Sequence, residues 1–61
     1  MDRITVLLNE RQALKIKLNN YKSLLNKTKS KNEIIRITKE MIQLNEKIKS
    51  IDLIIENLKG V

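Results

Sequence analysis

Residues 34–58 read IIRITKEMIQLNEKIKSIDLIIENL, and this stretch decides the fold. Its apolar residues recur at alternating spacings of three and four, which fill every a and d position of four heptads: Ile34, Ile37, Met41, Leu44, Ile48, Ile51, Ile55 and Leu58. A β-strand would instead show a period of two. The pattern therefore predicts a coiled-coil type α-helix, which we expect to span about residues 31–59.

The N-terminal half repeats this spacing less perfectly. The a and d positions are taken by Ile4, Leu7, Leu14, Leu18, Tyr21, Leu25 and the polar Thr28. Asp2 is placed to cap the first turn, so a first helix is predicted over about residues 3–27. Arg11 falls at an a position. There it either extends along its stem to solvent near a bundle end, or fixes the register by reaching a carboxylate of a partner.

The junction between the halves is predicted to be a turn at about residues 28–30. The a positions run 4, 11, 18 and 25 in the first half but 34, 41, 48 and 55 in the second, so the heptad phase jumps by two residues. Continuous coiled coils accommodate insertions of three or four residues, and two fits neither. Ser30 and Glu33 have capping-box spacing, and Gly60 suits the C′ position of the second helix. One bent, continuous helix is the alternative, because the junction contains no Gly or Pro.

These features together predict an all-α fold, an antiparallel αα-hairpin with coiled-coil-like packing that makes one domain of residues 1–61. An antiparallel pair brings g positions beside g positions, so residues whose numbers sum to about 57 should lie side by side. This register places Glu10 beside Lys47 and Lys17 beside Glu40, two pairs of opposite charge. Exposed pairs contribute at most about 1 kcal/mol each, so they favour the register more than the stability.

A lone hairpin would leave half of each apolar stripe in water. Isoleucine-rich a and d positions also favour more than two helices around one axis. We therefore expect a homodimer in which two hairpins form a four-helix bundle. Its predicted self-association core comprises Leu7, Leu14, Leu18, Leu25, Ile34, Ile37, Met41, Leu44, Ile48, Ile51, Ile55 and Leu58.

The composition leaves little for catalysis. The chain has no His and no Cys, so Ser/His/Asp nucleophiles and thiolate zinc sites are excluded. Glu33 and Glu40 share one flank of the predicted seam but are surrounded by Lys and Arg, which favours a solvated flank over paired catalytic carboxylates. We expect no enzyme activity, no catalytic residues, no metal site and no cofactor.

The net charge of +6 is concentrated in residues 1–30, and Lys15, Lys22 and Lys29 repeat every seven residues. This lysine row is either a solvated flank or a surface for phosphates or an acidic protein. Nucleic-acid binding is disfavoured because Tyr21 is the only aromatic residue and only three Arg could read base edges.

A second set of apolar residues lies outside the predicted seam. Ile35, Ile42 and Leu53 lie about 150° from the heptad core of the second helix. A weaker row follows the first helix at Val6, Ala13 and Leu24, and Ile16 stands apart. These rows are either a dimer contact or a docking face for another protein. The candidate partner surface therefore comprises Ile35, Ile42, Leu53, Lys15, Lys22 and Lys29.

These observations favour a non-enzymatic protein–protein interaction module, a small regulator or inhibitor that binds and occludes a larger host protein. The alternatives are a nucleic-acid-binding protein that uses the basic face of the first helix, and a purely structural oligomerisation module. Lys, Asn and Ile make up 27 of the 61 residues, and their A/T-rich codons favour a bacterial, phage or mobile-element source. We expect a cytoplasmic protein, because the sequence has neither a membrane span nor a secretory signal.

Overall fold

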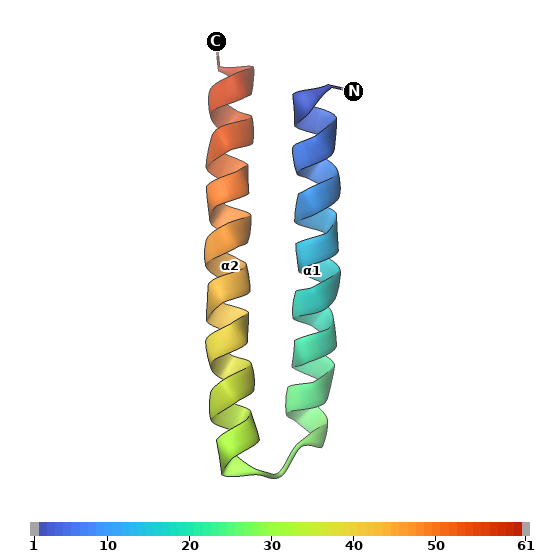
Figure 1. Cartoon of the computed structure of the whole chain (residues 1–61), viewed down its shortest axis with the longest axis vertical. Helices are drawn as coiled ribbons and strands as arrows, with labels where there is room; N and C mark the ends of the chain where they lie inside the picture. Colours follow the sequence, from blue (N-terminus) through green and yellow to red (C-terminus); the bar gives the residue numbers. More distant parts are fainter. Residues whose placement is uncertain (1, 61) are drawn as a thin grey trace.

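The computed structural model describes residues 2–60 of the chain. Helix α1 spans Arg3–Lys27 and helix α2 spans Lys31–Lys59. The helices lie side by side and antiparallel, so α1 begins at the end of the molecule where α2 finishes (Figure 1). The molecule measures 47 × 16 × 12 Å between Cα atoms. The predicted hairpin is confirmed, and the alternative of one bent helix is wrong.

The turn between the helices needs no glycine because its backbone is extended. Thr28, the C-cap of α1, has φ −82° and ψ 144°, and its N–H donates to the Leu24 carbonyl at 3.0 Å. Ser30, the N-cap of α2, has φ −81° and ψ 125°. No residue from Asp2 to Gly60 has a positive φ. Two extended cap residues therefore reverse the chain without the left-handed conformation that glycine would supply.

The capping side chains differ in part from those predicted. Asp2 caps α1, and its Oδ1 accepts from the Ile4 N–H at 3.3 Å. The predicted capping box is wrong, because the Ser30 side chain makes no cap hydrogen bond. The Glu33 carboxylate instead accepts from the Thr28 hydroxyl at 2.7 Å. This bond ties the end of α1 to the first turn of α2.

Gly60 also departs from the expectation of a C′ residue. It is the C-cap of α2, with φ −80° and ψ −1°, and its N–H donates to the Glu56 carbonyl at 2.9 Å. A C′ glycine of the usual kind would be left-handed. The chain therefore leaves α2 through a right-handed residue, and the glycine supplies no special backbone geometry here.

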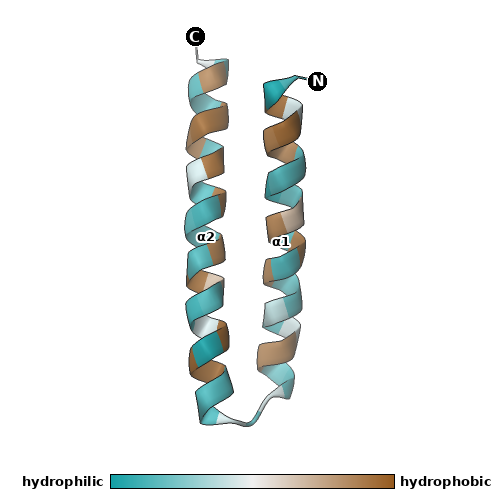
Figure 2. Ribbon diagram, viewed as in Figure 1, coloured by the Kyte–Doolittle hydropathy of each residue, from teal (hydrophilic) through white to brown (hydrophobic). Residues whose placement is uncertain are grey.

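Both helices turn their heptad seam towards each other. Hydrophobic and hydrophilic segments alternate along each ribbon, as this periodicity requires (Figure 2). On α1 and its C-cap the side chains that are not exposed are those at a and d positions: Ile4, Leu7, Arg11, Leu14, Leu18, Tyr21, Leu25 and the C-cap Thr28. On α2 the buried side chains are Ile37, Leu44, Ile48, Ile51 and Ile55. The centre of the core is Leu18 with Leu44 and Ile48, flanked by Leu14, Tyr21 and Met41.

The seam opens at the two ends of α2. Ile34 and Leu58 occupy a and d positions, yet each is 37% exposed in the single chain. Ile34 lies in the first turn of α2, opposite the last turn of α1, which ends at Lys27. Leu58 lies beyond the level at which α1 begins at Arg3. Ile34 therefore faces only the end of a helix, and Leu58 has no helix opposite it.

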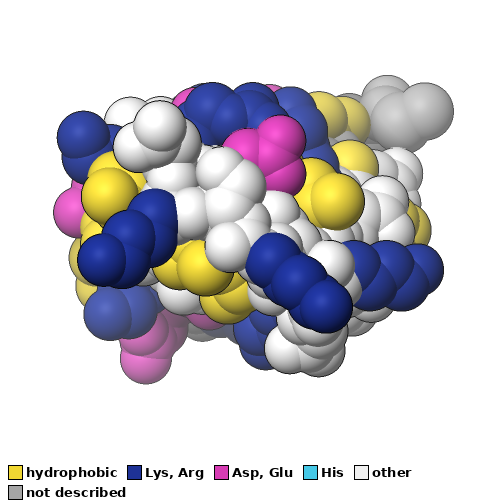
Figure 3. Space-filling view, turned by 90° about the horizontal axis from the view of Figure 1, so that it is seen from below, with side chains coloured by type: hydrophobic (Ala, Val, Ile, Leu, Met, Phe, Trp, Pro, Cys, Tyr) yellow, Lys and Arg dark blue, Asp and Glu magenta, His cyan; other side chains and the backbone are white. Residues whose placement is uncertain are grey.

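The turn end of the molecule is strongly basic. Lys27, Lys29 and Lys31 border the turn, and all three are exposed. Viewed along the long axis from this end, Lys and Arg side chains surround the molecule and acidic side chains are fewer (Figure 3). Between Asp2 and Gly60, neither helix has a stretch that is both long and apolar enough to cross a membrane.

Candidate interaction surfaces

The seam divides the hairpin surface into two broad faces, which we name by heptad position. The g face carries Arg3, Glu10, Lys17 and Leu24 of α1 and Glu33, Glu40, Lys47 and Ile54 of α2. The e face carries Leu8, Lys15 and Lys22 of α1, Lys29 of the turn, and Thr38, Asn45, Asp52 and Lys59 of α2. In an antiparallel pair, like positions lie on the same side of the seam. The two faces therefore present different chemistry to possible partners.

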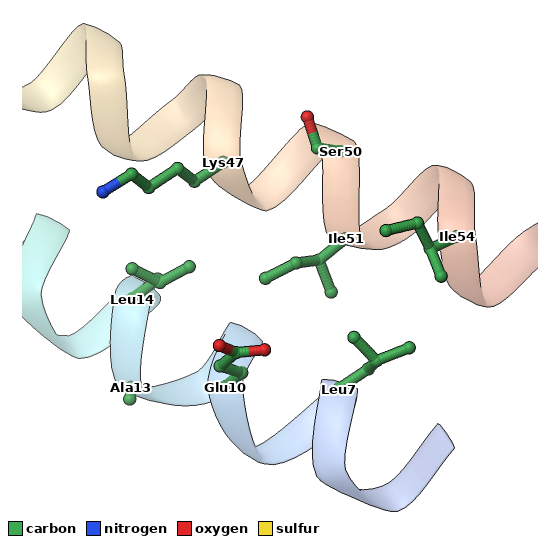
Figure 4. Close-up of a pocket in the computed structure, with 8 residues that line it drawn as sticks. All are labelled: Leu7, Glu10, Ala13, Leu14, Lys47, Ser50, Ile51 and Ile54. Atoms are coloured by element: carbon green, nitrogen blue, oxygen red, sulfur yellow. The ribbon is translucent and has the colours of Figure 1, made fainter. Parts of the chain in front are cut away.

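A shallow groove runs along the g face between the N-terminal half of α1 and the C-terminal half of α2. Its volume is about 490 Å³, and it is lined by Leu7, Glu10, Ala13, Leu14, Lys47, Ser50, Ile51 and Ile54 (Figure 4). Apolar side chains from both helices point into it, while Glu10 and Lys47 come from opposite helices. The Ser50 hydroxyl donates to the Glu46 carbonyl of its own helix at 3.0 Å. The groove is therefore largely apolar, with one acidic and one basic group beside it.

The register predicted from charge is observed, but its ion pairs are not. Glu10 and Lys47 line the same groove, as their sum of 57 requires. Within residues 2–60, however, neither Glu10 with Lys47 nor Lys17 with Glu40 comes within the 4.0 Å of an ion pair. These side chains are long, and all but the partly buried Glu40 are exposed, so water competes for their charges and their conformational entropy opposes pairing.

The one ion pair that the described part of the chain contains lies on the e face. Arg11 Nε is 3.0 Å from Asp52 Oδ1. Arg11 is one-third exposed, and its enclosed Nε–H is not directed at the oxygen, so the contact is electrostatic and not a hydrogen bond. Sequence reasoning considered a carboxylate of a partner and missed this one within the chain, because it paired only g positions with g positions. The sequence could have indicated this pair, because Asp52 is an e residue about one helical turn from the level of Arg11.

The candidate partner residues fall on two sides of the hairpin. Ile35 and Ile42 are 55% and 54% exposed, and the lysine row of Lys15, Lys22 and Lys29 is also exposed. The register sets Ile35 level with Lys22 and Ile42 level with Lys15, on the e-face side of the seam. Leu53 is also exposed but occupies an f position, on the side of α2 that points away from α1. The structure therefore groups Ile35 and Ile42 with the lysine row, and separates Leu53 from them.

Some exposed apolar residues escaped the sequence analysis. Leu8 and Ile54 are each 41% exposed at e and g positions, directly beside the seam. They were overlooked because they belong to neither the a and d pattern nor the outer rows. The outer residues Val6, Ile16 and Leu24 are exposed as expected, and so is Ala13. Ile54 and Leu24 add apolar surface to the g face, and Leu8 adds it to the e face.

No family model matches the chain, and neither a curated protein nor a solved structure matches it. Among residues 2–60, no three acidic side chains lie close enough together to hold a metal ion.

Proposed function

We propose that this chain is a non-enzymatic protein–protein interaction module, a small regulator or inhibitor that occludes a surface of a larger protein. We further propose that it acts as a homodimer, in which two hairpins form a four-helix bundle. The observation that carries the binding role is the e-face side of the seam, where two isoleucines are more than half exposed and a row of three lysines is exposed on the same side of the hairpin.

This combination favours an apolar partner surface with an acidic border. Burying Ile35 and Ile42 would supply affinity, because each isoleucine removed from water contributes about 1.5–3 kcal/mol at most. The lysine row would add charge complementarity, which accelerates association and selects the partner. Ile35 and Ile42 are two exposed isoleucines on the same face of α2. Helices that dock on other helices present apolar residues in this way.

Nucleic-acid binding is the weaker candidate. Phosphates would be contacted by the lysine row, but they would leave Ile35 and Ile42 without a role. The only aromatic side chain, Tyr21, is half-buried against the core and offers no platform for base stacking. The expected cytoplasmic location and the phage or mobile-element source stay predictions from the sequence.

The test compares capture by the native chain with capture by two matched variants. Tagged protein is incubated with nuclease-treated lysate of the native host, and each captured protein is then purified and titrated calorimetrically. The double variant Ile35→Lys/Ile42→Lys should lose at least tenfold in affinity for the true partner, since each change puts a charge into an apolar contact. Ile16→Lys, on a residue 52% exposed on the outer side of α1, should bind like the native chain.

The outcomes separate the three roles. A protein whose binding is lost only in the double variant, and weakens only mildly between 50 and 200 mM salt, supports the proposal. Captured nucleic acid, bound with a steep salt dependence and lost on Lys15→Gln/Lys22→Gln, would replace it with the nucleic-acid role. A chain that self-associates but captures no ligand would leave the structural oligomerisation module. Both variants are checked for native helicity and mass first.

A further inference from the structure

We infer that a second copy of this chain covers the g face, with the two-fold axis parallel to the long axis of the hairpin. Both turns would then lie at the same end of the dimer. This inference deepens the dimerisation proposed above and rests on it, while the partner-binding role of the e face stands apart from it.

The single chain has a small core that a second copy would enlarge. Ile37 is the only large side chain fully buried among the described residues, and α1 contributes Leu18 alone to the buried set. Leu7 and Leu14 stay half-buried where they line the groove. A 61-residue chain with so little buried surface has little stability in reserve against the entropy of ordering its backbone. The broad face measures 47 × 16 Å, close to the roughly 800 Å² per partner that specific interfaces bury.

The two faces differ in their suitability for self-association. The e face is bridged by the Arg11–Asp52 ion pair and carries the lysine row of Lys15, Lys22 and Lys29. Two such faces would bring charges of the same sign together. The g face holds the apolar groove, extended by the exposed Leu24 and Ile54, and carries both signs of charge. A second copy therefore fits the g face better.

The orientation follows from the position of the groove along the g face, and the charges agree with it. A two-fold axis parallel to the helices sets each α1 against α2 of the other copy at the same level. Glu10 then faces Lys47 of the partner subunit, and Lys17 faces Glu40 of the partner subunit. None of these four groups makes an ion pair within residues 2–60. A two-fold axis across the helices would instead set Glu10 against Lys17 of the partner subunit, so charge alone does not choose the axis. The groove does, because its lining residues all lie in the half of the hairpin away from the turn. The parallel axis sets groove against groove, whereas the crossed axis would set the groove against the turn half of the other copy.

The first measurement is the oligomeric state, followed by the orientation of the turns. Sedimentation equilibrium at tens of micromolar should give twice the chain mass of 7.2 kDa. The chain has no cysteine, so Ser30→Cys, at an exposed site whose side chain makes no cap bond, accepts a single spin label. Pulsed electron paramagnetic resonance should then give a label-to-label distance far shorter than the 47 Å length of the hairpin.

Charge reversal tests the proposed contacts. Glu10→Lys should weaken the dimer roughly tenfold, because it replaces two attractive contacts per dimer with repulsive ones. Glu10→Lys/Lys47→Glu should restore it. Glu46→Lys makes the same charge change at an outer f position and should leave the dimer unaffected.

Each unfavourable result overturns a different statement. A mass of one chain would overturn the dimer and leave the e-face binding test untouched. A dimer whose labels lie about one hairpin length apart would overturn the orientation alone. A dimer indifferent to Glu10→Lys would overturn the g face as its interface.

Discussion

Arg11 and Asp52 form an ion pair across the helix–helix seam, at a height where the heptad pattern calls for an apolar residue on α1. Arg11 Nε and Asp52 Oδ1 are 3.0 Å apart, and both side chains reach solvent. Partly exposed pairs of this kind contribute at most about 1 kcal/mol, because water screens the charges and ordering both side chains costs entropy. The pair therefore adds little to the stability of the fold, and its main effect is to span the seam on the e-face side.

Arg11→Leu is therefore expected to raise the free energy of unfolding by about 1 kcal/mol. The loss of the ion pair is small, whereas a leucine at this a position would bury up to about 1.5–3 kcal/mol of apolar side chain. Urea unfolding at one fixed protein concentration measures the change. Asp52→Asn removes only the charge and should lower the free energy of unfolding by less than about 1 kcal/mol. A loss of stability in Arg11→Leu would show that the ion pair outweighs apolar packing here.

The contrast between Ile37 and Ile35 gives a matched test of the seam. The two residues are of the same type and stand two positions apart, but Ile37 is fully buried and Ile35 is mostly exposed. Ile37→Ala should cost about 2–4 kcal/mol through lost burial and the cavity left behind. Ile35→Ala should stay within about 0.5 kcal/mol of the native chain. Thermal and urea unfolding measure both, and equal losses would contradict the observed rotation of α2.

The open ends of the seam should be less sensitive than its middle. Ile34→Ala and Leu58→Ala are each expected to lower the free energy of unfolding by about 1 kcal/mol or less, because both side chains already contact water. Measured under the same conditions, each loss should be under half of that for Ile37→Ala. Losses that match Ile37→Ala would mean that the assembled protein covers these ends.

The two N-caps should respond differently to alanine. Asp2→Ala removes a side-chain acceptor that contacts the Ile4 N–H, and it should cost about 0.5–1 kcal/mol and fray the start of α1. Ser30→Ala removes a hydroxyl that makes no cap bond, so its effect should stay below about 0.3 kcal/mol. Amide hydrogen exchange in the first turn of each helix measures the two effects. Greater fraying in Ser30→Ala than in Asp2→Ala would sink this interpretation of the caps.

Much of the fold could be predicted because it depends on local periodicity. The phase jump between Leu25 and Ile34 predicted the reversal, and the observed bounds Arg3–Lys27 and Lys31–Lys59 lie where the pattern placed them. The Arg11–Asp52 pair could not be found in this way. A long side chain can reach several neighbours within one helical turn, and its heptad position does not say which of them it contacts. The Glu33 carboxylate likewise had both its own cap and Thr28 within reach, and it accepts from Thr28.

For the candidate surfaces, the exposure of each residue could be predicted from the sequence, but the grouping of the residues could not. The exposure of Ile35, Ile42 and Leu53 follows from their distance around the helix from the seam, which is a property of one helix. Their grouping is not, because it requires the register of α1 against α2. That register sets Ile35 and Ile42 beside the lysine row and leaves Leu53 on the outer side. It also brings Glu10 and Lys47 to one groove without pairing them.

The two helices, the turn and the residues that form the seam follow from local sequence pattern, because backbone hydrogen bonding and apolar periodicity act within each helix. The tertiary structure decided which charges meet, which seam positions stay open and which exposed residues share a face. Those outcomes depend on the relative height and rotation of two helices and on the reach of their side chains. They arise only when both helices are in place, since no single segment contains the distances that decide them.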